Sequence, residues 1–217
     1  MNQILNFVLM MLILVISIAI HEFSHAIVGE RLGDPTPRRQ GRITLNPLAH
    51  LDRVGTLMIV MSSLAGFGIG WGKPVQVNPY NFRTSPQVGM GVVAVAGPIS
   101  NVILAILGAL VFQMAQISTG NFLAAFLINW VIINMALALF NLLPVFPLDG
   151  YNVFVAILHT LRQDWSLQLA RFWQKQVQYG PLFLVLLLII DWQFPQISPI
   201  KWVLGQPLWA IVGALLG

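Results

Sequence analysis

The stretch VISIAIHEFSHAIVGERLG, residues 15–33, places two histidines and a glutamate inside an otherwise apolar run. Titratable side chains are costly within the hydrocarbon of a membrane and seldom occur there without a function. His21, Glu22 and His25 therefore require a compensating partner, which another part of the chain must supply.

The composition indicates a membrane protein. Of the 217 residues, 57% are apolar and only 8% are charged, whereas soluble domains carry about a quarter charged residues. A soluble fold of this length would have too little polar surface to cover so many apolar side chains. We therefore predict an all-α polytopic membrane protein with a single domain over residues 1–217. The first apolar run lacks a basic start and is too long for a cleaved signal peptide, so we expect it to remain as a helix.

Charge and cysteine content exclude other classes of site. The chain has no cysteine, which excludes disulfides and thiolate metal sites. Its net charge of +4 is small and confined to predicted loops, so no nucleic-acid partner is expected. In a membrane protein such charges mark the cytoplasmic side.

Apolar runs predict about five spanning helices, because a spanning helix needs about 20 mostly apolar residues. The predicted spans are residues 4–32, 88–116, 121–147, 179–192 and 199–217. Residues 54–70 are also apolar but rich in glycine and serine. Basic residues flank this segment on both sides, so we predict a re-entrant segment there, with a further span as the alternative.

The basic segments also predict an orientation in the cell membrane. Lys and Arg concentrate in residues 31–53, 73–83 and 162–175. The positive-inside rule places these segments in the cytoplasm. The N-terminus is then outside, the C-terminus is inside, and the histidine pair opens toward the cytoplasm.

The histidine pair has the spacing of a metal site. His21 and His25 are four residues apart, so a helix places both on one face, one turn apart. Two such imidazoles can bind one metal ion, and Glu22 lies close enough to act on a water bound to that ion. This H-E-x-x-H pattern is a zinc signature. A packed, hydrogen-bonded histidine cluster is the alternative.

A catalytic zinc ion takes three protein ligands and keeps one position open. Of the seven acidic residues, only Asp149 ends an apolar helix that runs toward the same membrane face as His21 and His25. Pro144 and Pro147 interrupt that helix, which allows the carboxylate to turn inward. Asp149 is also a candidate N-cap for the following helix, and capping is compatible with ligation.

Further motifs accompany the histidine pair. AGPISN occupies residues 96–101 and NLLPVFPLDG occupies residues 141–150, while GRITLNPLAHLD (41–52) and GWGKPVQVNPYNFR (70–83) lie between the predicted spans. Together with H-E-x-x-H, these motifs resemble the site-2 protease family of intramembrane zinc metalloproteases. The small prokaryotic branch without a PDZ domain is the most similar. The resemblance covers residues from about 15 to about 160.

The resemblance implies an endopeptidase that hydrolyses peptide bonds in or near transmembrane segments. Its partners would be a transmembrane protein substrate and the lipid bilayer. It implies one zinc ion held by His21, His25 and Asp149, with Glu22 as catalytic acid and base. The catalytic core would cover about residues 1–160, followed by accessory helices.

By the same resemblance, Asn101 and Asn141 lie near the site. Either side-chain amide would donate to the developing oxyanion or position the substrate. The alternative for each is a hydrogen bond that packs helices together.

Two loop sequences predict strands near the site. GRITLNP (41–47) and GKPVQVNP (72–79) alternate polar and apolar residues and end at Asn-Pro, which is typical of a strand followed by a turn. We predict a short β-hairpin or strands there, with one edge holding an unwound substrate by strand addition. The alternative is a hairpin that closes the mouth of the cavity. We expect His50 and His159 at the surface and not as metal ligands.

Two other functions remain as alternatives. Membrane zinc endopeptidases of the prenyl-protein type share H-E-x-x-H but usually take their third ligand from a later glutamate, and the Leu-Asp-Gly sequence argues against this class. A non-proteolytic zinc-binding membrane protein, such as a partner binder or carrier, is the other candidate. Binding alone does not require a general base, so Glu22 argues against it.

Overall fold

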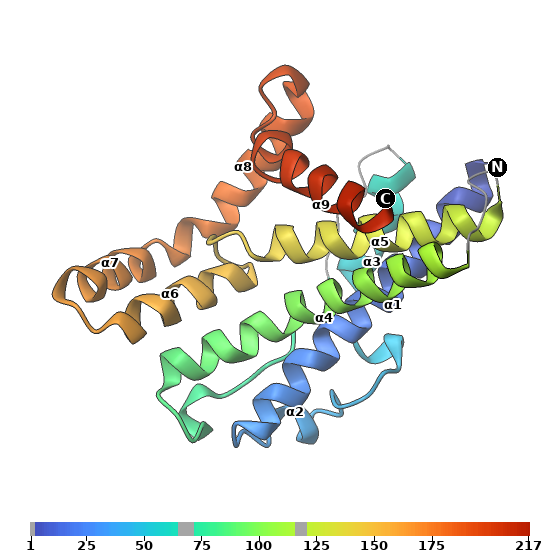
Figure 1. The fold of residues 1–217 in the computed structure, drawn as a ribbon. Helices are drawn as coiled ribbons and strands as arrows, with labels where there is room; N and C mark the ends of the chain where they lie inside the picture. The colour runs from blue at the N-terminus through green and yellow to red at the C-terminus, as the bar shows by residue number, and fades with distance from the viewer. Residues whose placement is uncertain (1–2, 65–71, 116–120) are drawn as a thin grey trace.

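The computed structural model describes residues 3–64, 72–115 and 121–217, and these residues form a mainly helical fold (Figure 1). The three long helices are α1 (Gln3–Arg31), α4 (Pro86–Met114) and α5 (Phe122–Asn141). The shorter helices are α2 (Thr36–Arg39), α3 (Arg53–Leu64), α6 (Asp149–Leu161), α7 (Asp164–Lys175), α8 (Gly180–Gln193) and α9 (Gln206–Leu216). Single 3-10 or π turns occur at Pro47–Ala49, Pro79–Asn81, Val177–Tyr179, Pro195–Ile197 and Lys201–Gly205.

Helix α4 is the centre of the fold and packs against α1, α5 and α6. Small residues allow this close approach, as is common in membrane helices. A Cβ atom added at Gly91 would lie 2.2 Å from the Cβ of Ala156 in α6, and one at Gly108 would lie 2.6 Å from the Trp130 ring in α5. The core between α4, α5 and α9 contains Ala105, Ala109, Val131, Met135 and Val212.

The prediction of about five spans is wrong. Within the described residues, only α1, α4 and α5 are long and apolar enough to cross a membrane. Helices α8 and α9 have 14 and 11 residues. At 1.5 Å per residue, α8 reaches about 21 Å, and α9 together with the π turn that continues into it (Lys201–Leu216) reaches about 24 Å. Both lengths are short of the ~30 Å hydrocarbon core. Helix α8 covers almost the whole apolar run at 179–192, and the π turn continues directly into α9, so both runs form helices that are simply too short to span.

The C-terminal helix folds back onto the long helices instead of spanning. The side-chain amide of Gln113, near the end of α4, donates to the Leu215 carbonyl at 2.8 Å. Since α4 runs antiparallel to α1, this end of α4 lies beside the N-terminal half of α1. The structure therefore places the C-terminal turn on the same side of the long helices as the N-terminal half of α1. Five spans had predicted the two ends on opposite sides.

The predicted β-hairpin is not present in the described residues. There the only β-pairing is an isolated antiparallel bridge between Leu51 and Gly72. After the bridge at Gly72 and the hydrogen bond from the Lys73 N–H to the His50 carbonyl, backbone groups of the 72–78 segment bond to side chains and not to a second strand. The Val75 N–H donates to Glu22 Oε2 at 3.0 Å, and Arg42 donates to the Pro74 carbonyl at 3.3 Å. Alternation of polar and apolar residues here reflects an extended segment held by side chains.

Asp34 fixes the far end of the 72–78 segment to the end of α1. Its side chain is fully buried. The carboxylate accepts hydrogen bonds from the Asn78 N–H at 2.6 Å and from the Asn81 amide at 2.8 Å. It also accepts from the Thr36 hydroxyl at 2.7 Å and the Thr36 N–H at 3.1 Å. The segment that contacts Glu22 is thus tied to the same helix that carries Glu22.

Two further expectations concern this region. His50 is fully buried and bonds through Nε2 to the Thr44 carbonyl at 2.8 Å, so its predicted surface position is wrong. His159 is half-buried. The predicted re-entrant segment begins as α3, but residues 65–71 lie outside the described residues, so its path remains a prediction.

We predict that Asp34→Ala destabilises the protein and loosens the 72–83 region. The substitution leaves buried donors without an acceptor, which costs about 3 kcal/mol. The expected results are a lower Tm in detergent and faster trypsin cleavage after Arg83. Asp164→Ala, at an exposed position that begins α7, is the control and should change neither. Equal behaviour of the two variants would contradict the anchoring role.

The same anchor predicts a pH dependence. Burial raises the pKa of Asp34, but the hydrogen bonds from Asn81, Thr36 and Asn78 outweigh it and hold the pKa below its ordinary value of 3.8. Because the folded-state pKa is the lower one, the stabilisation is complete above pH 3.8 and is lost as the pH falls through the folded pKa. The Tm difference between wild type and Asp34→Ala should therefore shrink only in strong acid.

Candidate metal centre

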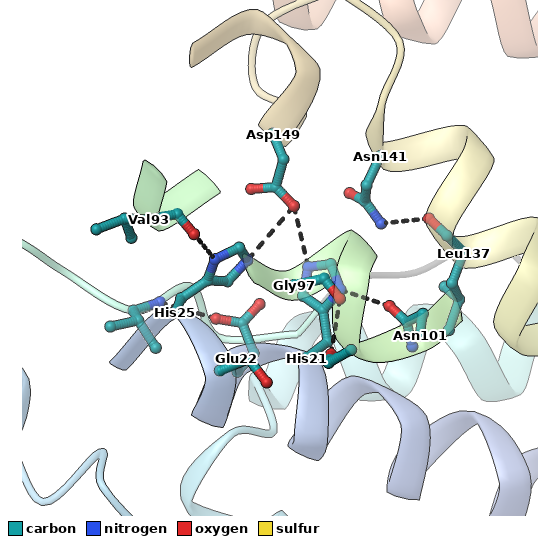
Figure 2. A network of polar contacts seen from close by, with 12 residues as sticks. His21, Glu22, His25, Val93, Gly97, Asn101, Leu137, Asn141 and Asp149 are labelled. Atoms are coloured by element: carbon teal, nitrogen blue, oxygen red, sulfur yellow. Dashed lines mark hydrogen bonds and ion pairs between the residues drawn. The ribbon is translucent and has the colours of Figure 1, made fainter. Parts of the chain in front are cut away.

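Three side chains from two helices converge beside α4 (Figure 2). His21 and His25 extend from α1, and Asp149 is the first residue of α6. Asp149 Oδ2 lies 3.0 Å from His21 Nε2 and 3.4 Å from His25 Nε2. The three candidate ligand atoms all lie within 4.8 Å of one another. The structure thus brings together the three residues that the sequence predicted as ligands.

Glycine and proline bring Asp149 to the histidines. Helix α5 ends at Asn141, and a turn that contains Pro144 and Pro147 leads directly into α6. A Cβ atom at Gly150 would lie 2.2 Å from the Leu142 carbonyl oxygen. The start of α6 therefore packs directly on the end of α5, and only glycine fits there.

Each imidazole is oriented by a hydrogen bond at its other nitrogen. His25 Nδ1 lies 2.8 Å from the Val93 carbonyl, and His21 Nδ1 lies 2.6 Å from Asn101 Oδ1. A carbonyl oxygen only accepts, so Nδ1 must be the donor in both bonds. In the neutral imidazoles, both Nε2 lone pairs then face the carboxylate of Asp149.

The arrangement fits a bound cation. Asp149 Oδ2 is buried and receives no hydrogen bond from the described residues. Two imidazole lone pairs and a carboxylate oxygen are all acceptors, so they repel one another unless a positive charge lies between them. Ligand atoms at about 2.0–2.1 Å from a tetrahedral zinc ion lie about 3.3 Å apart, close to the 3.0 and 3.4 Å observed.

Gly97 provides the space for these side chains. A Cβ atom at this position would lie 2.5 Å from His21 Nε2 and 2.5 Å from His25 Nε2. The backbone of α4 therefore forms one wall of the centre, and no side chain can stand between it and the imidazoles.

Glu22 lies beside the centre without joining the ligand cluster. One carboxylate oxygen, Oε2, accepts the Val75 N–H at 3.0 Å. A Cβ atom at Gly72 would lie 3.9 Å from the other oxygen, Oε1. The 72–78 segment therefore holds one oxygen of Glu22. Among the described residues, no side chain or backbone group donates a hydrogen bond to the other oxygen, Oε1.

The two asparagines occupy different places. Asn101 is fully buried behind His21, and its Nδ2 donates to Asn134 Oδ1 at 2.9 Å. Asn141 is half-buried at the end of α5, where its Nδ2 donates to the Leu137 carbonyl at 2.9 Å. The close-up shows Asn141 on the same side of the histidines as Asp149 (Figure 2).

Sequence reasoning did not single out Val93, Gly97 or Asn134. Val93 acts through its backbone and Gly97 through the lack of a side chain, so neither has a chemical signal of its own. Asn134 has one, because a polar side chain in an apolar helix indicates a function by default.

Curated relatives of this chain are bacterial. "Putative zinc metalloprotease YwhC" of Bacillus subtilis is 41% identical over 149 residues, which is 64% of this chain and 64% of the relative. "Putative zinc metalloprotease Rip2" of Mycolicibacterium smegmatis is 28% identical over 179 residues, 80% of this chain and 63% of the relative. Rip2 of Mycobacterium tuberculosis is 30% identical over 137 residues, 63% of this chain and 52% of the relative.

The chain thus spans less than two thirds of the length of these relatives. No family model and no solved structure matches it. The similarities confirm, through relatives named as zinc metalloproteases, the resemblance to the site-2 protease family that the motifs indicated.

We predict that Gly97→Ala disrupts the centre. The added methyl group would overlap both imidazoles, so zinc affinity, measured by competition with a chromophoric chelator, should fall at least about tenfold. Gly213→Ala is the matched control, because a Cβ atom at that helical position meets nothing within 4 Å. Wild-type affinity in Gly97→Ala would show that the imidazoles lie farther from α4 than described.

Proposed function

We propose that this homologue of bacterial zinc metalloproteases is an intramembrane endopeptidase that hydrolyses peptide bonds in or near transmembrane segments. The observation that carries the proposal is the position of the centre. The H-E-x-x-H residues lie on α1, one of the three helices suited to cross a membrane, and Asp149 completes the ligand set. From His25 the helix continues to Arg31, about 9 Å at 1.5 Å per residue, which supports a centre below the membrane surface.

We infer zinc as the metal, held as one ion by His21, His25 and Asp149. Two imidazoles and a carboxylate suit zinc, and the relatives are named as zinc metalloproteases. When bound, zinc would polarise the scissile carbonyl and lower the pKa of a water molecule.

Glu22 is the proposed general base and acid. The Val75 N–H holds Oε2, so we assign Oε1 to accept the proton from the attacking water. The same oxygen then delivers that proton to the leaving amine. The hydrogen bond to Val75 keeps the carboxylate oriented through both steps.

Different roles follow for the two asparagines. Asn101 is buried, and its amide is already bonded to His21 and Asn134, which favours a role in orienting His21. Asn141 is half-buried and leaves Oδ1 and one N–H unassigned among the described contacts. We therefore assign to Asn141 the donation to the oxyanion or to the substrate backbone.

We propose that the protein lies in the cell membrane with its centre opening toward the cytoplasm. The basic residues that follow α1, Arg162 directly after α6, and the basic residues of α7 support this orientation. The proposed partners are a transmembrane protein substrate and the surrounding lipid, and no nucleic acid.

Glu22→Gln tests the mechanism. We expect it to retain zinc and to lower the cleavage rate of a model transmembrane substrate about 10²- to 10⁴-fold. Glu30→Gln is the control, because Glu30 is on the same helix but pairs with Arg38. It should cleave at the wild-type rate. Chelator should stop cleavage by wild type, and added zinc should restore it.

Two results would contradict the proposal. Unchanged cleavage by Glu22→Gln would remove Glu22 from the mechanism. Zinc-loaded wild type that cleaves none of a panel of transmembrane substrates would favour the non-proteolytic zinc-binding protein.

The orientation is testable because the chain has no cysteine. Single variants Asn121→Cys and Asp164→Cys introduce one thiol at each predicted face, and both positions are exposed. In right-side-out vesicles, a membrane-impermeant maleimide should label Asn121→Cys and not Asp164→Cys. Inverted vesicles should give the reverse, and the opposite pattern would invert the proposed topology.

A further inference from the structure

Asn134 is a polar residue in the middle of an apolar helix, and the proposed mechanism does not use it. It is fully buried in α5, within the sequence NWVIINM (129–135). Asparagine in a membrane helix is expensive unless its amide has partners. The partners of Asn134 lead to the metal centre.

A chain of hydrogen bonds connects α5 to His21. Asn134 Nδ2 donates to the Trp130 carbonyl at 2.9 Å. Asn101 Nδ2 donates to Asn134 Oδ1 at 2.9 Å, and Asn101 Oδ1 lies 2.6 Å from His21 Nδ1. Asn101 and Asn134 are both fully buried, and His21 is 7% exposed, so water does not compete for these bonds.

The Trp130 carbonyl, at one end of this series of hydrogen bonds, fixes which group donates in each bond. A backbone carbonyl accepts hydrogen bonds and cannot donate. Asn134 must therefore turn its NH₂ group toward Trp130 and its oxygen toward Asn101. Asn101 must in turn donate through Nδ2 and present Oδ1 to His21. The Ser17 carbonyl, 3.5 Å from Asn101 Nδ2, is a second acceptor on that side.

The direction of the chain decides which nitrogen of His21 carries the proton. Since Asn101 presents an oxygen, the proton must lie on Nδ1. Nε2, which faces Asp149 at 3.0 Å, then has a free lone pair. A reversed Asn101 amide would put the proton on Nε2, the nitrogen that must bind the metal.

Trp130, whose carbonyl accepts the hydrogen bond from Asn134, is itself held in place. The Trp130 indole N–H donates to the Leu104 carbonyl of α4 at 2.8 Å. The ring also packs against Gly108, where a Cβ atom would lie 2.6 Å from it. Trp130 therefore fixes α5 against α4 next to the hydrogen-bond chain.

We infer that Asn134 is a positioning residue that sets the tautomer of His21 through Asn101 and so preorganises Nε2 as a metal ligand. The inference rests on the proposed metal centre and not on protease activity. Outer partners of metal-binding histidines fix ring orientation and tautomer in this way, and their loss typically weakens metal binding 10- to 100-fold.

The test measures zinc affinity of the purified full chain in detergent by chelator competition. Asn134→Leu keeps the volume but removes both hydrogen bonds, and we expect about tenfold weaker zinc binding. Asn134→Asp keeps an oxygen that accepts from Asn101 Nδ2, so its affinity should stay within about twofold of wild type.

A third variant, Asn134→Thr, keeps the test decisive if Asn134→Leu fails to fold. A threonine at position 134 can donate to the carbonyl four residues earlier, as Thr160 does to Ala156, but its oxygen is one bond too short to reach Asn101. Asn134→Thr should therefore fold and still bind zinc about tenfold more weakly.

Asn129→Leu is the matched control. Asn129 lies on the same helix and makes the same type of bond, from Nδ2 to the Ala125 carbonyl at 2.8 Å. Its zinc affinity should equal that of wild type.

The inference is overturned if Asn134→Leu and Asn134→Thr bind zinc like wild type. It is also overturned if Asn129→Leu or Asn134→Asp loses as much affinity as Asn134→Leu, since the effect would then come from packing. Wild type that binds zinc but cleaves no substrate would refute the protease and leave the role of Asn134 intact.

Discussion

Three hydrogen-bond acceptors point at one another in the interior of this protein. The Nε2 atoms of His21 and His25 face Asp149 Oδ2 at 3.0 and 3.4 Å. When both imidazoles are neutral, this arrangement is repulsive unless a metal ion lies between the three atoms, and burial makes the repulsion stronger because the local dielectric constant is low. The surrounding structure prevents these three acceptor atoms from turning toward other hydrogen-bond donors. Each imidazole has its other nitrogen occupied, and Asp149 is held by the tight junction of α5 and α6.

Helix α4 provides much of this organisation without supplying a ligand. Val93, Gly97 and Asn101 are spaced four residues apart, so they lie on one face of α4. That face meets α1 and gives it a carbonyl, an open space and an amide. The other faces of α4 contact α5 and α6, the helices that carry Asn134 and Asp149. The metal centre is therefore as much a product of helix packing as of the H-E-x-x-H sequence.

The residues that converge were predictable from sequence, but the elements around them were less so. In H-E-x-x-H the two histidines are four residues apart, and a helix places residues at this spacing on one face. The distribution of basic residues separately selected Asp149 as the third ligand, from a distant part of the sequence. The number of spans was overestimated because the apolar runs at 179–192 and 199–217 were counted as spans, although each forms a helix shorter than the about 20 residues that a span needs. The strands were predicted from alternation, which also arises when side chains such as Glu22 and Asp34 hold an extended segment. The role of Asn134 depends on which helices are neighbours, and one sequence does not contain that information directly.

Gly97 has a consequence for how such sites are recognised. A hydrogen atom is all that this position can carry, because every other amino acid would begin with a carbon atom where the two imidazole rings already lie. The position has no reactive group, no charge and no hydrogen-bonding side chain, yet a Cβ atom there would lie 2.5 Å from ring atoms of both His21 and His25. Searches that rank residues by chemical reactivity will pass over it. Mapping the tolerated substitutions along α4 would instead reveal the shape of the centre as a set of positions where only the smallest residue is allowed.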